Sequence, residues 1–241
     1  MGEQHDITLK LNVVNKKIHL TIILVDCGIE LIPKEIRDAP AVKNNFSQQI
    51  YSSQLLDNTL HHTAMKNLKN AERRGRPDIT HLCLLNALGS PANKSGDLHL
   101  FFHTTHNRIF KINPEIRIAR NYNRFKGLMA KLLIDGSIKV NGTYLISQVE
   151  GGLQKLINQY KSSEVSILSS KGELIRDIAQ LFDIDSSKEK IIIIGGFQKG
   201  NFSNEILGLS KNIFSISKHS LDAWVVVSKI INFYEITHNI M

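Results

Sequence analysis

Five residues in the middle of the chain combine charge and spacing in a way that points to a phosphate-rich partner. They are Arg76 with Asp78, and then Arg117, Arg120 and Arg124. The forked N–H groups of a guanidinium bind two phosphate oxygens at once. Asp78 follows Arg76 across a turn, at a spacing that allows a bidentate ion pair to hold the arginine in one orientation. Alternatively, Asp78 is the N-cap of the helix that follows, and both roles can coexist.

The charge around these arginines is concentrated in one segment of the chain. From Lys66 to Lys131 there are 13 Lys and Arg against 4 Asp and Glu, a surplus of +9. Residues 1–65 carry −1 and residues 132–241 carry 0, so this segment accounts for the net charge of +8 of the 241-residue chain. A merely solvated helix face would alternate the two signs. The surplus therefore predicts a nucleic-acid partner.

Two helices should position these arginines. The first begins at Asp78, because Pro77 disfavours helix before it, and Gly89 ends it. The second is expected at residues 122–133, from the apolar spacing of Phe125, Leu128, Met129, Leu132 and Leu133. Arg124 then lies in a helical first turn, where a cation opposes the macrodipole and is more easily explained by a ligand than by stability.

The approach to the second helix carries the other two arginines. Pro114 and the pair Ile118-Ala119 favour an extended segment that leads to Tyr122, although the 117-120-124 spacing would also place the three arginines on one helical face. In either arrangement, the three guanidinium groups project from one short stretch of chain.

The remaining pattern predicts an α/β fold. The first part of the chain should contain a β-branched strand at residues 18–25, a polar helix at 53–72, strands at 98–103 and 108–112, and a hairpin around Asn141-Gly142. After the hairpin, helices and strands alternate. Helices are expected at 153–160, 173–182 and 221–234, and strands at 165–169, 191–195 and 213–216. Strands that alternate with helices pair in parallel, and their carboxyl-end loops hold ligands.

Three such loops form the second candidate site. They are Leu168-Ser169, the glycine-rich GGFQKG at 195–200, and residues 214–221. Three loops at one edge of a parallel sheet make a natural adenosine cleft. GGFQKG lacks the GxGxxG spacing, and the chain has no GK[ST] motif, so neither a dinucleotide nor a nucleoside triphosphate is favoured. A tight turn without a ligand is the alternative.

Composition narrows the remaining possibilities. Cys27 and Cys83 lie in apolar runs, which indicates buried thiols in a reducing compartment. The start MGEQHDITLKLN lacks the apolar core of a secretory signal, and no apolar run reaches the roughly 18 residues of a membrane span. His99, His103 and His106 have no carboxylate or thiol placed to complete a metal site. We expect a soluble intracellular protein without a metal.

Two motifs at a fixed separation connect these features to a family. RPDITHLCLLNALGSPANKSG (76–96) and NPEIRIARNYNRFKGLM (113–129) closely resemble the Nep1/Emg1 family, which are pseudouridine N1-methyltransferases of the SPOUT superfamily. The resemblance extends from LVDCGIELIP to SISKHSLDAWVVVSKI, over almost the whole chain. It implies a SPOUT-type parallel sheet with a C-terminal trefoil knot, in a single domain of residues 1–241. Residues 30–75 and 97–150 would be insertions, and residues 163–241 the knotted cofactor-binding part.

The resemblance also implies roles for individual residues. The rRNA contacts fall on Arg76, Arg117, Arg120 and Arg124, while Asp78 orients Arg76 and is a possible proton acceptor. Water is the alternative acceptor. The S-adenosyl-L-methionine loops fall on Leu168, Gly195, Gly200, Phe214, Ser215, Ile216, Ser217, Lys218 and His219. The chain departs from the family in having Gly196 where alanine is frequent, and His219-Ser220 where a Tyr-Pro pair is frequent.

The implied activity is S-adenosylmethionine-dependent N1-methylation of a pseudouridine in small-subunit rRNA, with S-adenosylhomocysteine as product and no metal. The implied assembly is a homodimer that shares the rRNA-binding arginines, with ribosomal proteins or other assembly factors as further partners and no membrane. The KNAERRGRPD run resembles archaeal members, which favours the cytoplasm over the nucleolus. Two alternatives stay open: a non-catalytic rRNA-binding assembly factor, and a SPOUT methyltransferase for a different RNA base.

Overall fold

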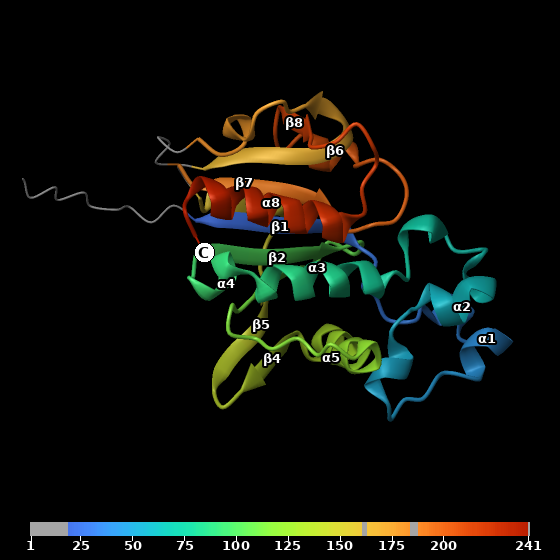
Figure 1. Cartoon of the computed structure of the whole chain (residues 1–241). Coiled ribbons are helices and arrows are strands. Elements are labelled where there is room, and N and C mark those ends of the chain that lie inside the picture. The colour runs from blue at the N-terminus through green and yellow to red at the C-terminus, as the bar shows by residue number, and fades with distance from the viewer. Residues whose placement is uncertain (1–18, 161–162, 184–187, 241) are drawn as a thin grey trace, which may run out of the picture.

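The structure is a computed structural model that describes residues 19–160, 163–183 and 188–240, and its centre is a single mixed sheet (Figure 1). Among these residues the strand order is β4-β5-β3-β2-β1-β7-β6-β8. The strands are β1 (Leu20–Cys27), β2 (Leu98–Thr104), β3 (Ile109–Ile112), β4 (Ser137–Val140), β5 (Thr143–Val149), β6 (Glu164–Leu174), β7 (Lys190–Gly195) and β8 (Asn212–Ser215).

The sheet has a parallel half and an antiparallel half. Strands β2, β1, β7, β6 and β8 pair in parallel. The alternation of strands and helices predicts this for β6, β7 and β8. Strands β2, β3, β5 and β4 pair antiparallel, and Asn141-Gly142 joins β4 to β5 as the predicted hairpin turn. The carboxyl ends of β1, β7, β6 and β8 therefore meet at the same edge of the sheet, where their loops can share one site.

Strand β1 is buried on both faces, which explains its continuous apolar run. Ile22 and Leu24 belong to a large core with the helices α3 (Pro77–Gly89), α5 (Tyr122–Asp135) and α8 (Ala223–Thr237). Ile23 and Val25 point into a second core with α6 (Leu153–Asn158) and α7 (Asn204–Leu207). Figure 1 shows α3 and α8 side by side on one face of the sheet. The short α4 (Pro91–Lys94) comes directly after α3 in the chain.

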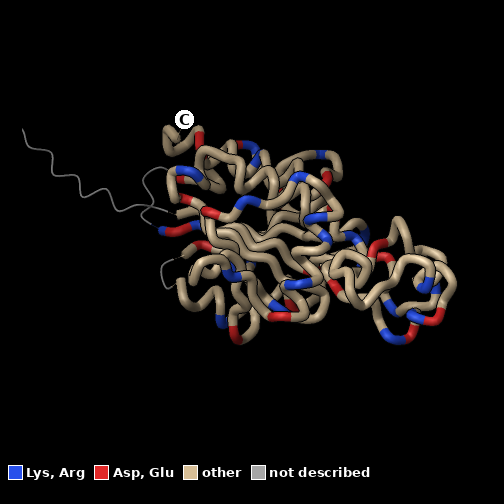
Figure 2. Tube along the Cα trace, turned by 90° about the horizontal axis from the view of Figure 1, so that it is seen from below, with Lys and Arg blue, Asp and Glu red and all other residues tan. Residues whose placement is uncertain are grey.

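A small lobe projects beyond the carboxyl edge of the sheet (Figure 1). It contains α1 (Pro40–Lys43) and α2 (Asn58–Met65), which pack on each other around their own apolar cluster of Ile32, Ile36, Val42, Leu56 and Met65. Basic and acidic positions both occur on this lobe in Figure 2. The lobe falls within residues 30–75, for which the resemblance implies an insertion.

Three sequence-based expectations about helices are wrong. The helix expected at 53–72 is shortened to α2. Asp57 is its N-cap and accepts a hydrogen bond from Thr59 N–H, and Asn70 has a φ of 56°, which is not helical. The helix expected at 173–182 is reduced to one 3₁₀ turn, Ile178–Gln180. The chain before this turn belongs to β6, which pairs with β8 again at Glu173 and Leu174. Gly172 permits this return, because an added Cβ would lie 2.6 Å from the backbone of Phe214.

The third error concerns Asp78, which is not an N-cap. Arg76 occupies the N-cap position of α3 with no side-chain cap, and Pro77 and Asp78 are the first two helical residues. The expected helix at 122–133 is confirmed as α5, with Asn121 as its cap. Ile18, the first residue of the expected first strand, and the N-terminal segment weighed as a secretory signal lie outside the described residues. Across the described ranges, no helix is both long and apolar enough to cross a membrane.

Candidate active site

The side chains of Arg76 and Asp78 form the ion pair that their spacing predicts. Arg76 Nε donates to Asp78 Oδ1 at 2.8 Å, and Arg76 Nη2 donates to Asp78 Oδ2 at 2.6 Å. These hydrogen bonds raise the pKa of Arg76 above its ordinary value, against the opposing effect of burial. Because both carboxylate oxygens accept from the same guanidinium, Asp78 holds Arg76 in a fixed direction. That this serves RNA binding stays a prediction.

Arg117, Arg120 and Arg124 are exposed and point away from the core. Ile116 and Ile118 flank Arg117 and are only 7% and 9% exposed, so the alternation turns the arginine outward. The stretch before α5 forms no helix, so the three arginines do not share one helical face, and Arg124 lies in the first turn of α5. Within the described part of the chain, none of these three guanidinium groups has a hydrogen-bond or ion-pair partner. Three unpaired guanidinium groups are available to a phosphate backbone.

A buried cluster attaches α5 to the lobe. Lys126 Nζ donates to Asp57 Oδ2 at 2.8 Å, and the Tyr122 hydroxyl donates to the same oxygen at 3.2 Å. Burial acts to raise the pKa of Asp57, but the bonds from Lys126 and Thr59 outweigh it and hold that pKa below its ordinary value. The same cluster fixes the direction of the helix that carries Arg124.

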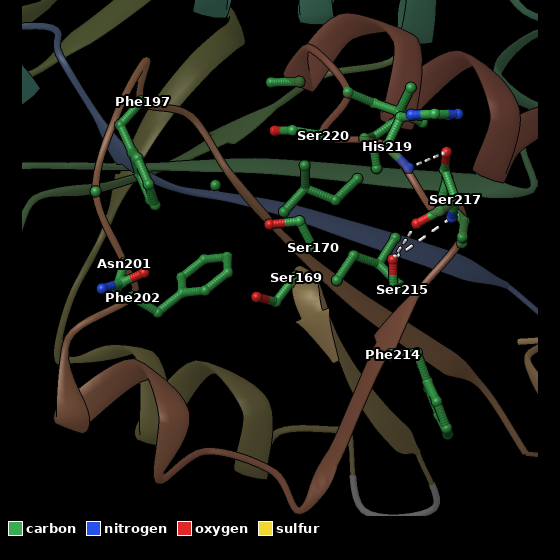
Figure 3. A pocket seen from close by; sticks show the side chains of 18 of the residues that line it. Ser169, Ser170, Phe197, Asn201, Phe202, Phe214, Ser215, Ser217, His219 and Ser220 are labelled. Carbon is green, nitrogen blue, oxygen red and sulfur yellow. Dashed lines mark hydrogen bonds between the residues drawn. The ribbon is translucent and has the colours of Figure 1, made fainter. Parts of the chain in front are cut away.

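A second site lies at the carboxyl edge of the parallel strands (Figure 3). Phe197, Asn201 and Phe202 lie on one side of the cleft and Ser215, Ser217 and His219 on the other, with Ser169 and Ser170 between them. The loop expected at Leu168-Ser169 is not a loop, because β6 continues to Leu174 with an irregular register between Leu168 and Glu173. The lining comes from this part of β6, from the ends of β7 and β8 with the loops that follow them, and from the start of α8: Leu168, Ser169, Ser170, Ile194, Gly195, Phe197, Gln198, Gly200, Asn201, Phe202, Phe214, Ser215, Ile216, Ser217, His219, Ser220, Leu221, Ala223 and Val226. We call this site the cleft.

The cleft lining is polar but contains no Lys, Arg, Asp or Glu. Ser215 Oγ donates to the Ser217 carbonyl at 2.7 Å, and His219 N–H donates to Ser217 Oγ at 3.0 Å, so the loop after β8 is held by its own hydroxyls. Phosphate groups in proteins are bound by basic side chains or glycine-rich helix starts. This cleft fits a ligand with an apolar body and hydrogen-bonding groups but no phosphate.

Two glycines shape the loop after β7. Gly200 has a φ of +109°, which favours glycine, and a Cβ at Gly195 would lie 2.7 Å from the ring of Phe197. The aromatic rings of Phe197 and Phe202 meet edge to face at 5.4 Å. These glycines therefore let the loop fold back so that Phe197 forms a wall of the cleft.

The residues that the resemblance assigns to the cofactor lie together, with one exception. All of them line the cleft except Lys218, which is exposed and absent from the lining, and the ring of Phe214 points away from the other labelled side chains in Figure 3. Sequence reasoning did not single out Asn201, Phe202 or Ala223. The first two follow the predicted glycine loop directly, whereas Ala223 carries no polar group or motif that could have marked it.

Other reactive side chains are occupied or buried. Burial raises the pKa of the Cys27 thiol to about 12, and Cys83 is a second buried free thiol, so neither is a nucleophile. His81 stacks on Phe125 at 4.3 Å and contacts the Ala119 carbonyl at 2.7 Å, as expected of a packed helix residue. In the described ranges, no group of three or more His, Cys, Asp or Glu is arranged to hold a metal.

Comparisons with known proteins identify the family of the chain. The family model described as "EMG1/NEP1 methyltransferase" matches residues 22–235. The chain belongs to the EMG1/NEP1 methyltransferase family. It is 41% identical to the ribosomal RNA small subunit methyltransferase Nep1 of Thermococcus onnurineus, over 90% of this chain and 98% of that protein. It is 38% identical to the Nep1 of Staphylothermus marinus, over 95% and 100%.

A solved member of the EMG1/NEP1 family has the same fold. The crystal structure of Archaeoglobus fulgidus Nep1 bound to S-adenosylhomocysteine superposes with a TM-score of 0.81, at 33% identity, and covers 92% of this chain and 100% of that one. The α/β fold with a central, partly parallel sheet is thus that of the family.

Proposed function

We propose that this protein transfers a methyl group from S-adenosylmethionine to N1 of a pseudouridine in small-subunit rRNA. The observation that carries the proposal is an uncharged cleft at the carboxyl edge of the sheet, next to a strongly basic segment. Membership of the EMG1/NEP1 family supports it, as do relatives named as small-subunit rRNA methyltransferases.

The residues of the cleft fit S-adenosylmethionine, which supplies an electrophilic methyl group when bound. Its adenosine has a flat aromatic base and a ribose, and it carries no phosphate, which suits a lining without Lys or Arg. The residues that would hold it are Leu168 within β6, Gly195 at the end of β7 and Gly200 in the loop that follows, and Phe214, Ser215, Ile216, Ser217 and His219 at the end of β8 and just after it. Lys218 contributes through its backbone at most, since its side chain does not line the cleft.

The arginines would hold the RNA rather than perform chemistry. Arg117, Arg120 and Arg124 are exposed and unpaired among the described residues, so they can bind phosphates, while Arg76 presents a guanidinium already oriented by Asp78. The target nucleotide must leave its stack to reach the methyl group, at a cost of a few kcal/mol. Phosphate contacts hold the RNA in register while the base is extruded, so catalysis is mainly positioning.

The proton on N1 of the pseudouridine must also leave. Both oxygens of Asp78 accept hydrogen bonds from Arg76, which makes this carboxylate an orienting group rather than a base. We therefore assign the proton to water and the orientation of Arg76 to Asp78.

The deciding experiment incubates the protein and labelled S-adenosylmethionine with matched RNA stem-loops that contain either pseudouridine or uridine. Methylation of the pseudouridine RNA alone supports the proposal. Transfer to both RNAs points to another base or atom. Tight RNA binding without any transfer would favour a non-catalytic assembly factor, and binding of S-adenosylhomocysteine measured by calorimetry separates that case from an inactive preparation.

We further propose that two copies form a homodimer in the cytoplasm, with ribosomal proteins or other assembly factors as partners. We also propose that the chain is a single domain of residues 1–241, in which residues 163–241 contain the trefoil knot of the superfamily. Leu82 on α3 and Ile236 on α8 are 38% and 61% exposed on the two helices that cover one face of the sheet, which supports an apolar contact there. Sedimentation equilibrium tests the dimer, and a monomeric mass at micromolar concentration would overturn it.

A further inference from the structure

Arg73 joins the basic segment to the cleft through several contacts at once. Its guanidinium lies 4.5 Å from the ring centroid of Phe197, and its Nη2 donates to the backbone carbonyl of Asn201. Its Nη1 lies 3.5 Å from Oδ2 of Asp26, at the carboxyl end of β1. Phe197 and Asn201 both line the cleft, and Asn201 lies 128 positions after Arg73 in the chain. No motif in the sequence connects these positions.

The fit around Arg73 is close on the cleft side. A Cβ added at Gly200 would lie 3.0 Å from Arg73 Nε, so the guanidinium packs directly over the glycine of the loop. Residues 197–203 form no helix or strand, so the loop receives little support from its own backbone. The cation–π contact and the bond to the Asn201 carbonyl therefore support this wall from outside the loop, beside the packing of Phe202 on the second core.

The backbone of Arg73 is itself held firmly. A Cβ at Gly28 would meet Arg76 N at 2.9 Å and the Arg73 carbonyl at 3.1 Å, so the segment after β1 packs against residues 73–76. Arg74 forks onto both oxygens of the buried Glu30, with contacts of 2.6 to 3.1 Å. We call residues 73–76 the arginine turn. Arg73 in this turn faces the cleft. Arg76, a proposed RNA contact, belongs to the same turn.

Asp26 gives Arg73 its third contact and is held in an unusual conformation. Its φ of 55° is a left-handed conformation that costs a non-glycine residue energy and persists only where its surroundings fix it. Asp26 N–H donates to His103 Nδ1 at 3.2 Å, and His103 Nε2 lies 2.7 Å from Asn107 Oδ1. The carboxylate is thereby directed at Arg73 from the end of the central strand.

We propose that Arg73 is a positioning residue for the methyl donor: it holds the wall formed by Phe197 and Asn201 in its ligand-binding place and couples that wall to the RNA-binding arginine turn. The proposal rests on the proposed function, since it takes S-adenosylmethionine as the ligand of the cleft. Two consequences follow. Loss of Arg73 weakens donor binding without a direct contact to RNA, and it reduces the effect of bound RNA on donor affinity.

The test measures the dissociation constant of S-adenosylhomocysteine by calorimetry, with and without a saturating RNA stem-loop, for the whole protein and its variants. We expect Arg73→Ala to raise this constant about tenfold and Arg73→Lys to raise it less, because lysine keeps the charge but loses the planar fork. In a protein that already carries Phe197→Leu, Arg73→Ala should raise the dissociation constant little further, since the two side chains act through one contact. The rate of methyl transfer at saturating donor should fall less than the donor affinity.

Arg37→Ala is the matched control. Arg37 also places its guanidinium over a phenylalanine ring, 5.3 Å from the centroid of Phe46, and donates to a backbone carbonyl, that of Ile32, but it lies in the lobe. It should leave S-adenosylhomocysteine affinity unchanged. Wild-type affinity in Arg73→Ala would overturn the proposal, as would additive effects of Arg73→Ala and Phe197→Leu. A wild-type protein that does not bind S-adenosylhomocysteine would instead overturn the proposed function.

Discussion

Arg76 and Asp78 are two residues apart, and their pair gives the sharpest test of what a single side chain does. Asp78→Asn keeps the size of the side chain but removes the charge that fixes both N–H groups of Arg76. We expect RNA affinity to fall about tenfold, in the range of a lost charge-assisted hydrogen bond. Donor affinity should stay unchanged, because neither residue lines the cleft. Fluorescence anisotropy with a labelled stem-loop measures the first and calorimetry the second.

The same variant separates the two roles considered for Asp78. If Asp78 only orients Arg76, methyl transfer at saturating RNA keeps most of its wild-type rate, and the loss appears in KM. A drop in kcat of a hundredfold or more at saturating RNA would instead identify Asp78 as the proton acceptor. Glu115→Gln is the control, since Glu115 is an exposed carboxylate in the same basic segment.

The contact between the end of β1 and the loop after β7 allows a prediction at the scale of elements. Gly196 N–H donates to the Val25 carbonyl at 2.7 Å, and a Cβ at Gly196 would lie 2.4 Å from Cys27 Sγ. Gly196→Ala should therefore destabilise the protein by about 1–3 kcal/mol through overpacking. Cys27→Ala makes room for the methyl group, so the double variant should recover most of that loss. Urea unfolding measures all three, and equal losses in the single and double variants would contradict the contact.

The junction between α2 and α5 predicts how stability depends on pH. Burial lowers the pKa of His61, and Lys126 lowers it further, although Asp57 opposes this. As the pH falls, the unfolded chain therefore protonates His61 at a higher pH than the folded chain does. The contribution of His61 to the free energy of unfolding is intact above about pH 6.5 and is lost as the pH falls below it. The pKa of Asp57 is also lowered, so its contribution is present above about pH 4 and disappears at more acid pH.

His61→Gln should therefore flatten the loss of unfolding free energy between pH 7 and 5, measured by urea titration. His62→Gln, which changes the exposed neighbour, should leave the curve unchanged. A wild-type protein as stable at pH 5 as at pH 7 would argue against a neutral, buried His61.

These elements also show what sequence patterns can and cannot reveal. The apolar run at residues 18–25 and the Asn141-Gly142 turn are local signals, and the structure contains a strand at Leu20–Cys27 and the predicted hairpin. The helix expected at 173–182 fails because Gly172 lets the chain return to β8, an interaction between distant segments that outweighs local preference. For the same reason Arg76 and Asp78 could be paired from sequence, whereas the contact from Arg73 to Asn201 could not.

For the molecule as a whole, the concentration of positive charge between Lys66 and Lys131 predicts how RNA binding responds to salt. Each phosphate neutralised by a side chain releases counterions, so the logarithm of affinity falls linearly with the logarithm of salt concentration, by about 0.7 per contact for single-stranded RNA. Arg117→Ala, Arg120→Ala and Arg124→Ala should each lower affinity and reduce this slope by about 0.7.

Lys211→Ala removes an exposed charge outside the basic segment and should leave the slope unchanged. If Lys211→Ala lowered the slope as much as Arg117→Ala does, RNA would be responding to the diffuse field of the protein and not to three particular guanidinium groups. Filter binding over 50 to 300 mM salt, about a sixfold range, distinguishes the two cases because one phosphate contact then changes affinity about three- to fourfold.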